Sequence, residues 1–381
     1  MQSAKQRCKI AMSVTSCICH DQRVLKISET LSKMGCDITL IGRKRSIFRW
    51  EEIPFKTVLF KMLFEKGFLF YKFFSLRLFF YLLFHRFDLL VANDLDTLLP
   101  NFLVSKIRKI PLVYDSHEYF TGVPEIQNRP LVKWVWRTIE RSLLPGMKYV
   151  MTVSKSIARQ YESEYGVKIS TVRNCSRRTD KIVPYRKAEL GIPDNALLLI
   201  LQGTGINIDR GSEELLEAIC RTRSVFLLII GSGDVIGRLK SRSGELKISS
   251  RVKFIPVVKW DELIRYTKSA DAGLSLDKNT NPNYLYSLPN KLFDYISSGI
   301  PVIVSDMPEV SAIVRDTGCG LIIDSVTPEK ISEAINRLKA DPEELAEFRR
   351  KSVIASKTLN WETESIILAE FYKKVFKESH L

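Results

Sequence analysis

The chain has 381 residues, with 58 Lys and Arg side chains against 43 Asp and Glu, so its formal net charge is +15. This length is more than one compact core usually holds and predicts two domains. Hydrophobic residues make up 45% of the chain, which excludes a disordered protein. The excess of positive charge favours anionic partners, among them nucleotide phosphates, acidic lipid surfaces and nucleic acid.

The seven cysteines do not form a metal-binding pattern. Cys17 and Cys19 stand too close together for a zinc-type pair, and no second Cys or His pair stands at ligand spacing. The first residues show no signal-peptide core and no cleavage site. We therefore expect no bound metal, reduced thiols and a cytoplasmic protein.

Short apolar runs alternate with helical stretches in the first half of the chain. The predicted strands are residues 9–14, 37–42, 89–92, 112–114 and 149–153, and a helix is predicted at residues 21–33. Strands that are apolar throughout and alternate with helices indicate a parallel sheet covered by helices on both faces.

The segment from Phe60 to Phe84 (residues 60–84) is aromatic and apolar enough to suggest a membrane span. Its five charged residues are Lys61, Glu65, Lys66, Lys72 and Arg77. On one helix these charges would fall within an arc of about 160°, and a spanning helix does not tolerate five charges near its middle. Two interpretations stay open: burial in the first domain, or insertion of the apolar face into a lipid interface.

After a polar and basic segment at residues 175–187, predicted as a linker, the strand–helix pattern restarts. Further strands are predicted at residues 196–202, 225–230, 252–255, 272–276, 301–305 and 320–323, and a final helix at 361–377. The sequence therefore predicts an α/β protein with two doubly wound Rossmann-like domains that face each other across a cleft. The domains are residues 1–180 with the returning helix 361–381, and residues 188–360.

A helix preceded by Pro289 and stopped by Gly299 is predicted after residue 288. The N-terminus of a helix favours an anion. Lys291 lies in the first turn, where a positive charge is not stabilised by the helix dipole, so a bound phosphate would explain this lysine. Asp294 lies one turn further on, within reach of a ribose hydroxyl. The alternative is an ordinary amphipathic helix with two solvated charges.

A second anion-binding loop follows the predicted strand at residues 196–202. Gly203 and Gly205 allow close approach of the backbone to a ligand, and Arg210 adds a forked cation. Together with Lys291 it suits a diphosphate leaving group, which gains charge as its bond to a sugar breaks. Ile208 stands in place of the third glycine of a dinucleotide fingerprint, and the Walker pattern is absent, so neither a dehydrogenase nor a P-loop enzyme is expected.

Polar residues also follow the predicted strands of the first half. His117 stands where an imidazole could meet a donor sugar or an acceptor hydroxyl, although a loop histidine that caps the structure is the alternative. Asp21 opens the first helix, either as an N-cap alone or also as a site residue. Asn93 and Asp94 follow another predicted strand at the same edge and are site candidates after His117 and Asp21.

The order of these segments resembles the family-four retaining glycosyltransferases of the GT-B fold, which use nucleotide-activated sugars. The resemblance is carried by residues 20–24, 114–118, 153–156, 172–174, 210–211, 231–234, 287–295 and 361–376. The Leu-Pro-Asn-Lys sequence at residues 288–291 is similar to one subgroup of that family.

The resemblance implies that Asp294 holds the ribose of the donor, Arg210 the diphosphate, and that His117 lies by the transferred sugar. The chain departs from the family twice: Tyr286 replaces an acid, and the usual arginine after the first glycine of the diphosphate loop is missing, so that Lys291 would supply the lost cation.

We therefore expect three groups of site residues. The catalytic group is His117, Arg210 and Lys291; the nucleotide-sugar contacts are Gly203, Gly205, Tyr286, Leu288, Pro289, Asn290 and Asp294; the acceptor side is Asp21, Arg23 and Glu118.

The expected activity is transfer of a sugar from a nucleotide diphosphate sugar to a glycan or polyprenyl-linked acceptor in cell-surface polysaccharide biosynthesis, with UDP preferred to GDP in the donor. The resemblance implies retention of configuration and no cofactor or metal. Peripheral attachment to the inner face of the cytoplasmic membrane is expected through residues 60–84. The alternatives left open are a sugar-nucleotide epimerase, a non-catalytic homologue and a nucleic-acid-binding module, of which the last has no recognition helix or aromatic-basic sheet to support it.

Overall fold

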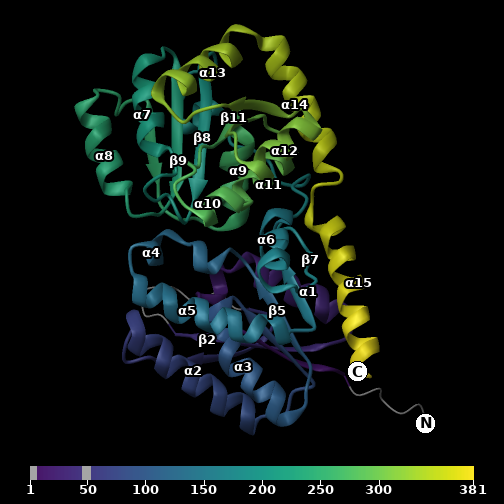
Figure 1. The fold of residues 1–381 in the computed structure, drawn as a ribbon. Helices are drawn as coiled ribbons and strands as arrows, with labels where there is room; N and C mark the ends of the chain where they lie inside the picture. The colour runs from purple at the N-terminus through teal and green to yellow at the C-terminus, as the bar shows by residue number, and fades with distance from the viewer. Residues whose placement is uncertain (1–6, 45–52) are drawn as a thin grey trace. The chain divides into compact units, whose positions relative to one another are not determined.

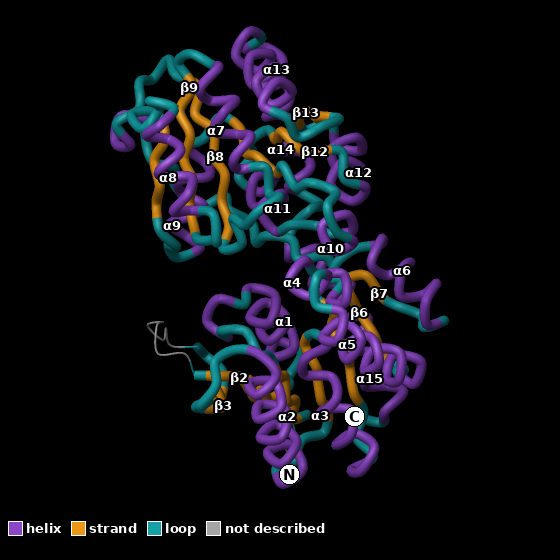
Figure 2. The backbone as a smooth tube through the Cα atoms, turned by 60° about the vertical axis from the view of Figure 1, so that its left-hand side comes forward, coloured by secondary structure: helices purple, strands orange, loops and turns teal. Residues whose placement is uncertain are grey.

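A computed structural model of the protein describes residues 7–44 and 53–381. The chain divides into two compact units, one made of Met1–Arg173 with Glu364–Leu381 and the other of Asn174–Thr363. Each unit contains one parallel sheet with helices packed around it, as the ribbon and the tube show (Figure 1; Figure 2). The predicted α/β class is confirmed.

The sheet of the first unit has the order β3-β2-β1-β4-β5-β6-β7. Its strands are β1 (Lys9–Ser13), β2 (Asp37–Arg43), β3 (Lys56–Phe60), β4 (Leu89–Asn93), β5 (Leu112–Ser116), β6 (Tyr149–Thr152) and β7 (Ser170–Thr171). The five inner strands match the predictions, whereas the edge strands β3 and β7 were missed. One edge strand is only partly buried and the other has two residues, so neither shows the apolar run of a central strand.

The helices of the first unit are α1 (Gln22–Lys33), α2 (Gly67–Phe84), α3 (Leu95–Arg108), α4 (Pro124–Gln127), α5 (Pro130–Leu143) and α6 (Lys155–Tyr165). Asp21 caps α1, because its side chain accepts a hydrogen bond from the backbone N–H of Val24 at 3.1 Å. Ser154 caps α6 in the same way through the N–H of Ile157.

The second unit has the strand order β10-β9-β8-β11-β12-β13. The strands are β8 (Leu197–Gly203), β9 (Val225–Gly231), β10 (Val252–Ile255), β11 (Ala272–Ser275), β12 (Val302–Ser305) and β13 (Gly320–Ile323). The helices are α7 (Ser212–Arg221), α8 (Ile236–Glu245), α9 (Trp260–Ser269), α10 (Pro282–Tyr286), α11 (Asn290–Ser297), α12 (Pro308–Thr317), α13 (Pro328–Ala340) and α14 (Pro342–Ser356).

Alternate residues of β8 enter two different cores, which explains why its residues 197–201 are all apolar. Leu199 belongs to the core under α7 and α13, whereas Ile200 belongs to the core under α11 and α14. The predicted linker at residues 175–187 is part of this unit. Cys175 is buried in the second core, and the hydroxyl of Thr179 donates to the carbonyl of Ser297 at 2.5 Å.

The final helix α15 (Trp361–Ser379) returns to the first unit from Glu364 onward, as predicted. The buried carboxylate of Glu364 accepts hydrogen bonds from the backbone N–H of Arg173 at 2.8 Å and from its Nε at 2.7 Å. Leu368, Tyr372 and Val375 are all buried. The returning helix therefore contributes both apolar surface and a charged contact to the first unit.

Residues 60–84 do not form one continuous helix. Phe60 ends β3 and the helix begins only at Gly67, so three of the five charges precede the helix and the charged arc does not form. α2 is apolar on both sides: Phe70, Phe74, Leu78 and Leu82 are buried, whereas the exposed large apolar residues are Phe68, Leu69, Phe73, Leu76, Phe80 and Phe84.

Replacement of Tyr372 tests the returning helix. Tyr372→Ala removes a fully buried ring and should lower the free energy of unfolding of the first unit by about 3–5 kcal/mol. Tyr372→Phe is the matched control, because no described residue hydrogen-bonds the buried hydroxyl, and it should change stability by less than about 1 kcal/mol. Urea denaturation followed by circular dichroism measures both, and equal losses in the two variants would contradict this packing.

Candidate functional site

The strand order of each unit defines a switch point, where neighbouring strands send their connections in opposite directions. In the first unit it lies between β1 and β4, and in the second between β8 and β11. Ligands of doubly wound sheets bind beside the carboxyl ends of strands at such points. In each unit a cluster of charged residues lies there.

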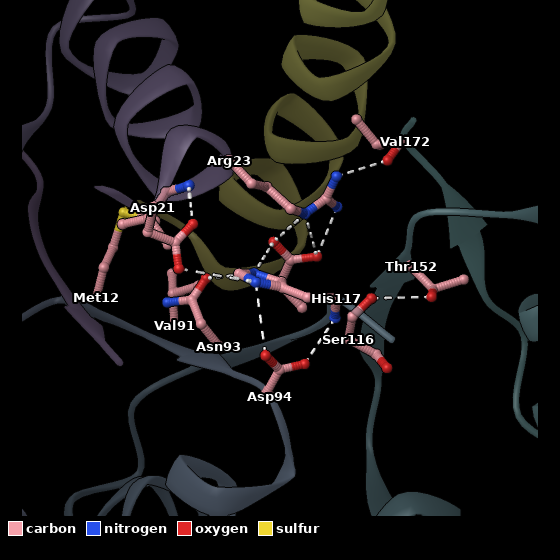
Figure 3. A network of polar contacts seen from close by, with 12 residues as sticks. Met12, Asp21, Arg23, Val91, Asn93, Asp94, Ser116, His117, Thr152 and Val172 are labelled. Atoms are coloured by element: carbon pink, nitrogen blue, oxygen red, sulfur yellow. Dashed lines mark hydrogen bonds and ion pairs between the residues drawn. The ribbon is translucent and has the colours of Figure 1, made fainter. Parts of the chain in front are cut away.

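His117 is the centre of the cluster in the first unit (Figure 3). Its Nδ1 lies 3.5 Å from Oδ2 of Asp94 and 4.0 Å from Oδ2 of Asp21, and its Nε2 lies 3.3 Å from Oδ2 of Asp115. Asn93 adds its side-chain oxygen at 3.3 Å from Nε2. Residues at or after the ends of β1, β4 and β5 thus converge on one imidazole, and the roles predicted for Asp21 and His117 stay predictions.

Asp94 holds His117 through the backbone as well. Its Oδ1 accepts a hydrogen bond from the backbone N–H of His117 at 2.8 Å. The backbone of Asp94 has a φ of 61° and a ψ of 166°, a region that costs a residue with a side chain about 1–3 kcal/mol. Such strain is concentrated at functional sites, which favours Asp94 as a site residue.

Arg23 is buried and directed into the fold. Its guanidinium donates to both oxygens of Asp115, at 2.6–3.1 Å, and to the carbonyl of Val172 at 2.7 Å (Figure 3). Because Arg23 is buried, these bonds hold Asp115 beside His117, and the predicted contact of Arg23 with an acceptor stays a prediction. Asp115 was not among the predicted site residues, although it lies in the last two residues of β5, just before His117.

The carboxylates hold His117 in its charged form. Burial alone would lower the pKa of His117, but the charges of Asp94 and Asp115 raise it to about 10. Burial raises the pKa of Asp94, whereas at Asp115 the charges and hydrogen bonds of Arg23 and His117 together outweigh burial and lower its pKa to about 2. A charged imidazole donates hydrogen bonds and cannot accept a proton, so His117 suits the binding of a hydroxyl or a developing negative charge.

In the second unit, the loop after β9 supports the glycine loop after β8. The N–H of Ser232 donates to the carbonyl of Gly203 at 3.0 Å, and the N–H of Ile206 donates to the carbonyl of Ser232 at 3.0 Å. A Cβ on Gly231 would lie 1.8 Å from the Gly203 oxygen, so no larger residue fits. Gly203 itself has a φ of 148°, which favours glycine, and Gly205 is exposed.

Arg210 and Lys291 converge on one carboxylate. Nη1 of Arg210 lies 3.0 Å from Oδ2 of Asp277, and Nζ of Lys291 lies 3.7 Å from Oδ1 of the same residue. The guanidinium carbon also lies over the ring of Tyr284, 3.9 Å from its centroid. Two cations that are 81 positions apart in sequence therefore face a single carboxylate, and their binding of a diphosphate stays a prediction.

The charges in this cluster are largely withdrawn from water. Burial lowers the pKa of Lys291, and the nearby Arg210 adds to this effect while Asp277 opposes it. Burial opposes the charge of Arg210 too, but Asp277 raises its pKa. Nε of Arg210 is buried and has no acceptor among the residues that the structure describes, so this donor could still bind a ligand oxygen.

Asp294 is buried, and both of its oxygens contact protein groups. Oδ2 accepts from the side-chain amide of Gln202 at 2.9 Å, while Oδ1 lies 3.3 Å from Nε1 of Trp260 and accepts from the hydroxyl of Ser176. The ribose contact of Asp294 stays a prediction, and a ribose hydroxyl would have to share these oxygens.

The other predicted nucleotide contacts surround the start of α11. Pro289 is its N-cap, Asn290 is exposed, Leu288 is buried in the core, and Tyr286 is partly buried at the end of α10. On the acceptor side, the carbonyl of Glu118 accepts a hydrogen bond from Ser116 at 2.8 Å. Asp277 was missed by the sequence analysis; its only signal was a carboxylate two residues after a strand.

Among residues 7–44 and 53–381, no group of three His, Cys, Asp or Glu side chains has the arrangement of a metal site.

Comparison with known families places both halves of the chain in one class. Residues 21–175 match the model of the Glycosyltransferase Family 4 domain, and residues 188–353 match that of the Glycosyl transferases group 1 domain. Lipopolysaccharide core biosynthesis glycosyltransferase LpsE of Rhizobium meliloti is 25% identical over 163 residues, which are 43% of this chain and 45% of that protein. D-inositol 3-phosphate glycosyltransferase of Nocardia farcinica is 27% identical over 163 residues, 42% of this chain and 35% of that protein. The matches thus span less than half the length of these two relatives.

Solved structures share the fold along nearly the whole chain. Sucrose-phosphate synthase from Thermosynechococcus elongatus has a TM-score of 0.81 at 17% identity and covers 98% of this chain and 100% of its own. HepE of Anabaena in complex with UDP-glucose has a TM-score of 0.77 at 16% identity and covers 96% of this chain and 99% of its own. The fold is therefore that of the GT-B class. Within this class, the chain belongs to the family-four-like group of glycosyltransferases that the two family models describe.

The charge on His117 can be observed directly. We expect nitrogen-15 NMR of labelled histidines to show both ring nitrogens of His117 protonated from pH 6 to 8.5, because its pKa is about 10. The His117→Gln variant identifies the signal. A titration centred near the ordinary value of about 6.5 would contradict the carboxylate network.

The same network predicts how stability depends on pH. The folded pKa of His117 lies above the unfolded one, so its stabilising effect is complete below about pH 6.5 and is lost as the pH rises toward about 10. Between pH 7 and 9.5 the wild-type protein should lose up to about 1.4 kcal/mol per pH unit more than His117→Gln. If the urea midpoints of the two proteins change equally with pH, the raised pKa of His117 is contradicted.

Proposed function

We propose that the protein transfers a sugar from a nucleotide diphosphate sugar to a glycan or polyprenyl-linked acceptor in the synthesis of a cell-surface polysaccharide. The observation that carries this proposal is the convergence of Arg210 and Lys291 on Asp277 at the switch point of the second unit. Two cations that reach the same carboxylate are close enough together to bind the two phosphates of one nucleoside diphosphate leaving group.

The chemistry follows from the charge on the leaving group. As the bond between sugar and diphosphate breaks, negative charge builds on the bridging oxygen, and fixed cations stabilise it without rearranging. Arg210 offers a forked donor, Lys291 a point charge, and the first turn of α11 contributes backbone N–H groups. In this proposal these groups neutralise the diphosphate where other enzymes use a divalent ion.

We propose retention of configuration by attack on the front face of the sugar. The departing phosphate oxygen accepts the proton of the incoming hydroxyl, so no carboxylate nucleophile is required. His117 would then donate a hydrogen bond to the sugar or the acceptor, in agreement with a pKa raised to about 10. UDP is the preferred nucleotide, which the complex of the structurally similar HepE with UDP-glucose supports.

Attachment to the inner face of the cytoplasmic membrane belongs to the same proposal, because a polyprenyl-linked acceptor lies there. By length and composition α2 could cross a membrane, and only 22% of it is buried. Since one side of α2 packs in the first unit, we propose that it lies in the lipid interface instead. Lys72 and Arg77 on the exposed side suit anionic headgroups.

Removal of either cation tests the catalytic proposal. Arg210→Ala and Lys291→Ala should each lower turnover of a UDP-sugar by about 10²–10³-fold, because each removes a stabilising charge from the leaving group. Lys330→Ala, at an exposed lysine paired with Glu333, should leave turnover unchanged. Assays with and without acceptor distinguish transfer from epimerisation, since an epimerase converts the donor alone. Unchanged turnover in both cation variants would overturn the assignment.

Membrane attachment is tested by flotation with vesicles that contain phosphatidylglycerol. Phe68→Ser combined with Phe80→Ser and Phe84→Ser removes exposed rings and should weaken vesicle binding at least about tenfold at low salt. Ile354→Ser with Ile366→Ser, at exposed apolar residues of other helices, is the matched control and should bind as the wild type does. If the wild-type protein stays in solution, the attachment proposal fails.

A further inference from the structure

Asp277 is a buried carboxylate for which the proposed reaction has no direct use. It follows β11 and is 2% exposed. Among the residues that the structure describes, no group meets the geometry of a hydrogen-bond donor to either of its oxygens. What it does have is two ionic contacts, with Arg210 at 3.0 Å and Lys291 at 3.7 Å.

This arrangement differs from that of Asp294, the other buried acid near the start of α11. Asp294 is hydrogen-bonded by the neutral groups of Gln202, Trp260 and Ser176, which would hold it whether or not a cation is near. Asp277 is held by charge. Its removal would leave two buried cations side by side, which repel each other and attract any available anion.

We propose that Asp277 is an internal counter-ion that occupies Arg210 and Lys291 in the empty protein and competes with the diphosphate for them. The inference rests on the proposed function. Two cations and one carboxylate leave the empty cluster with a net charge of +1. A diphosphate therefore binds at a net charge of +1, whereas the two cations without Asp277 would give +2.

The consequence for turnover is easier release of the product. A nucleoside diphosphate carries more negative charge at its phosphates after the sugar has left, so it binds the two cations more strongly than the donor does. Asp277 repels this product more than it repels the donor, and it pairs with Arg210 and Lys291 again when the product leaves. The residue acts on the reaction through Arg210 and Lys291 and is thus a positioning residue.

The test is calorimetric titration of UDP and of inorganic pyrophosphate into the wild type and Asp277→Asn. The amide keeps the shape of the side chain and removes its charge. We expect Asp277→Asn to bind both ligands at least about tenfold more tightly, to show lower kcat together with lower KM, and to be inhibited more strongly by UDP. Without ligand its melting temperature should fall, and UDP should raise it by more than in the wild type.

A second pair of variants serves if Asp277→Asn does not fold. Lys291→Gln leaves one cation with one carboxylate, and Asp277→Asn with Lys291→Gln restores the net charge of +1. The double variant should bind pyrophosphate at least about tenfold more tightly than Lys291→Gln. A purely structural role for Asp277 predicts weaker binding instead.

The outcomes separate the inference from the proposal on which it rests. If the wild type binds neither UDP nor pyrophosphate, and GDP also fails, the proposed function falls and the inference falls with it. If the wild type binds UDP and removal of the charge at Asp277 leaves the affinity unchanged or weakens it, only the inference is overturned.

Discussion

The need to neutralise buried charge organises both candidate sites of this protein. At the switch point of each sheet a basic residue lies out of water beside a carboxylate: Arg23 with Asp115 in one unit, and Arg210 with Asp277 in the other. A buried charge without a partner costs several kcal/mol, so separating either pair would strongly destabilise the fold. The residues that face ligands derive their positions and charges from these pairs.

The two clusters use this constraint differently. In the first unit the carboxylates outnumber the cations, and the result is an imidazole that stays charged at neutral pH and donates hydrogen bonds. In the second unit the cations outnumber the carboxylate, and the remaining positive charge favours an anion. One cluster thus suits hydroxyl groups and the other a phosphate group.

The sequence predicts the inner strands well because a strand covered on both faces must be largely apolar, as in residues 197–201 of β8. It fails for α2, where an even apolar composition gave no boundary: Gly67, which has a φ of 76°, begins the helix after three of the charges. Within the sites, the sequence singles out Arg210 and Lys291 because each lies beside the start of a predicted helix, and their ligand contacts stay predictions. Asp277 was missed, since only tertiary contacts distinguish its carboxylate from any loop acid.

The central claim is that the Arg210 guanidinium and the Lys291 ammonium bind one diphosphate, and paired titrations of UDP and uridine test it most directly. Because uridine has no phosphates, the account predicts that Arg210→Gln and Lys291→Gln each weaken UDP binding at least about tenfold and leave uridine binding unchanged. If either variant keeps full affinity for UDP, or loses affinity for uridine to the same extent, the two cations do not share a diphosphate and the account is contradicted.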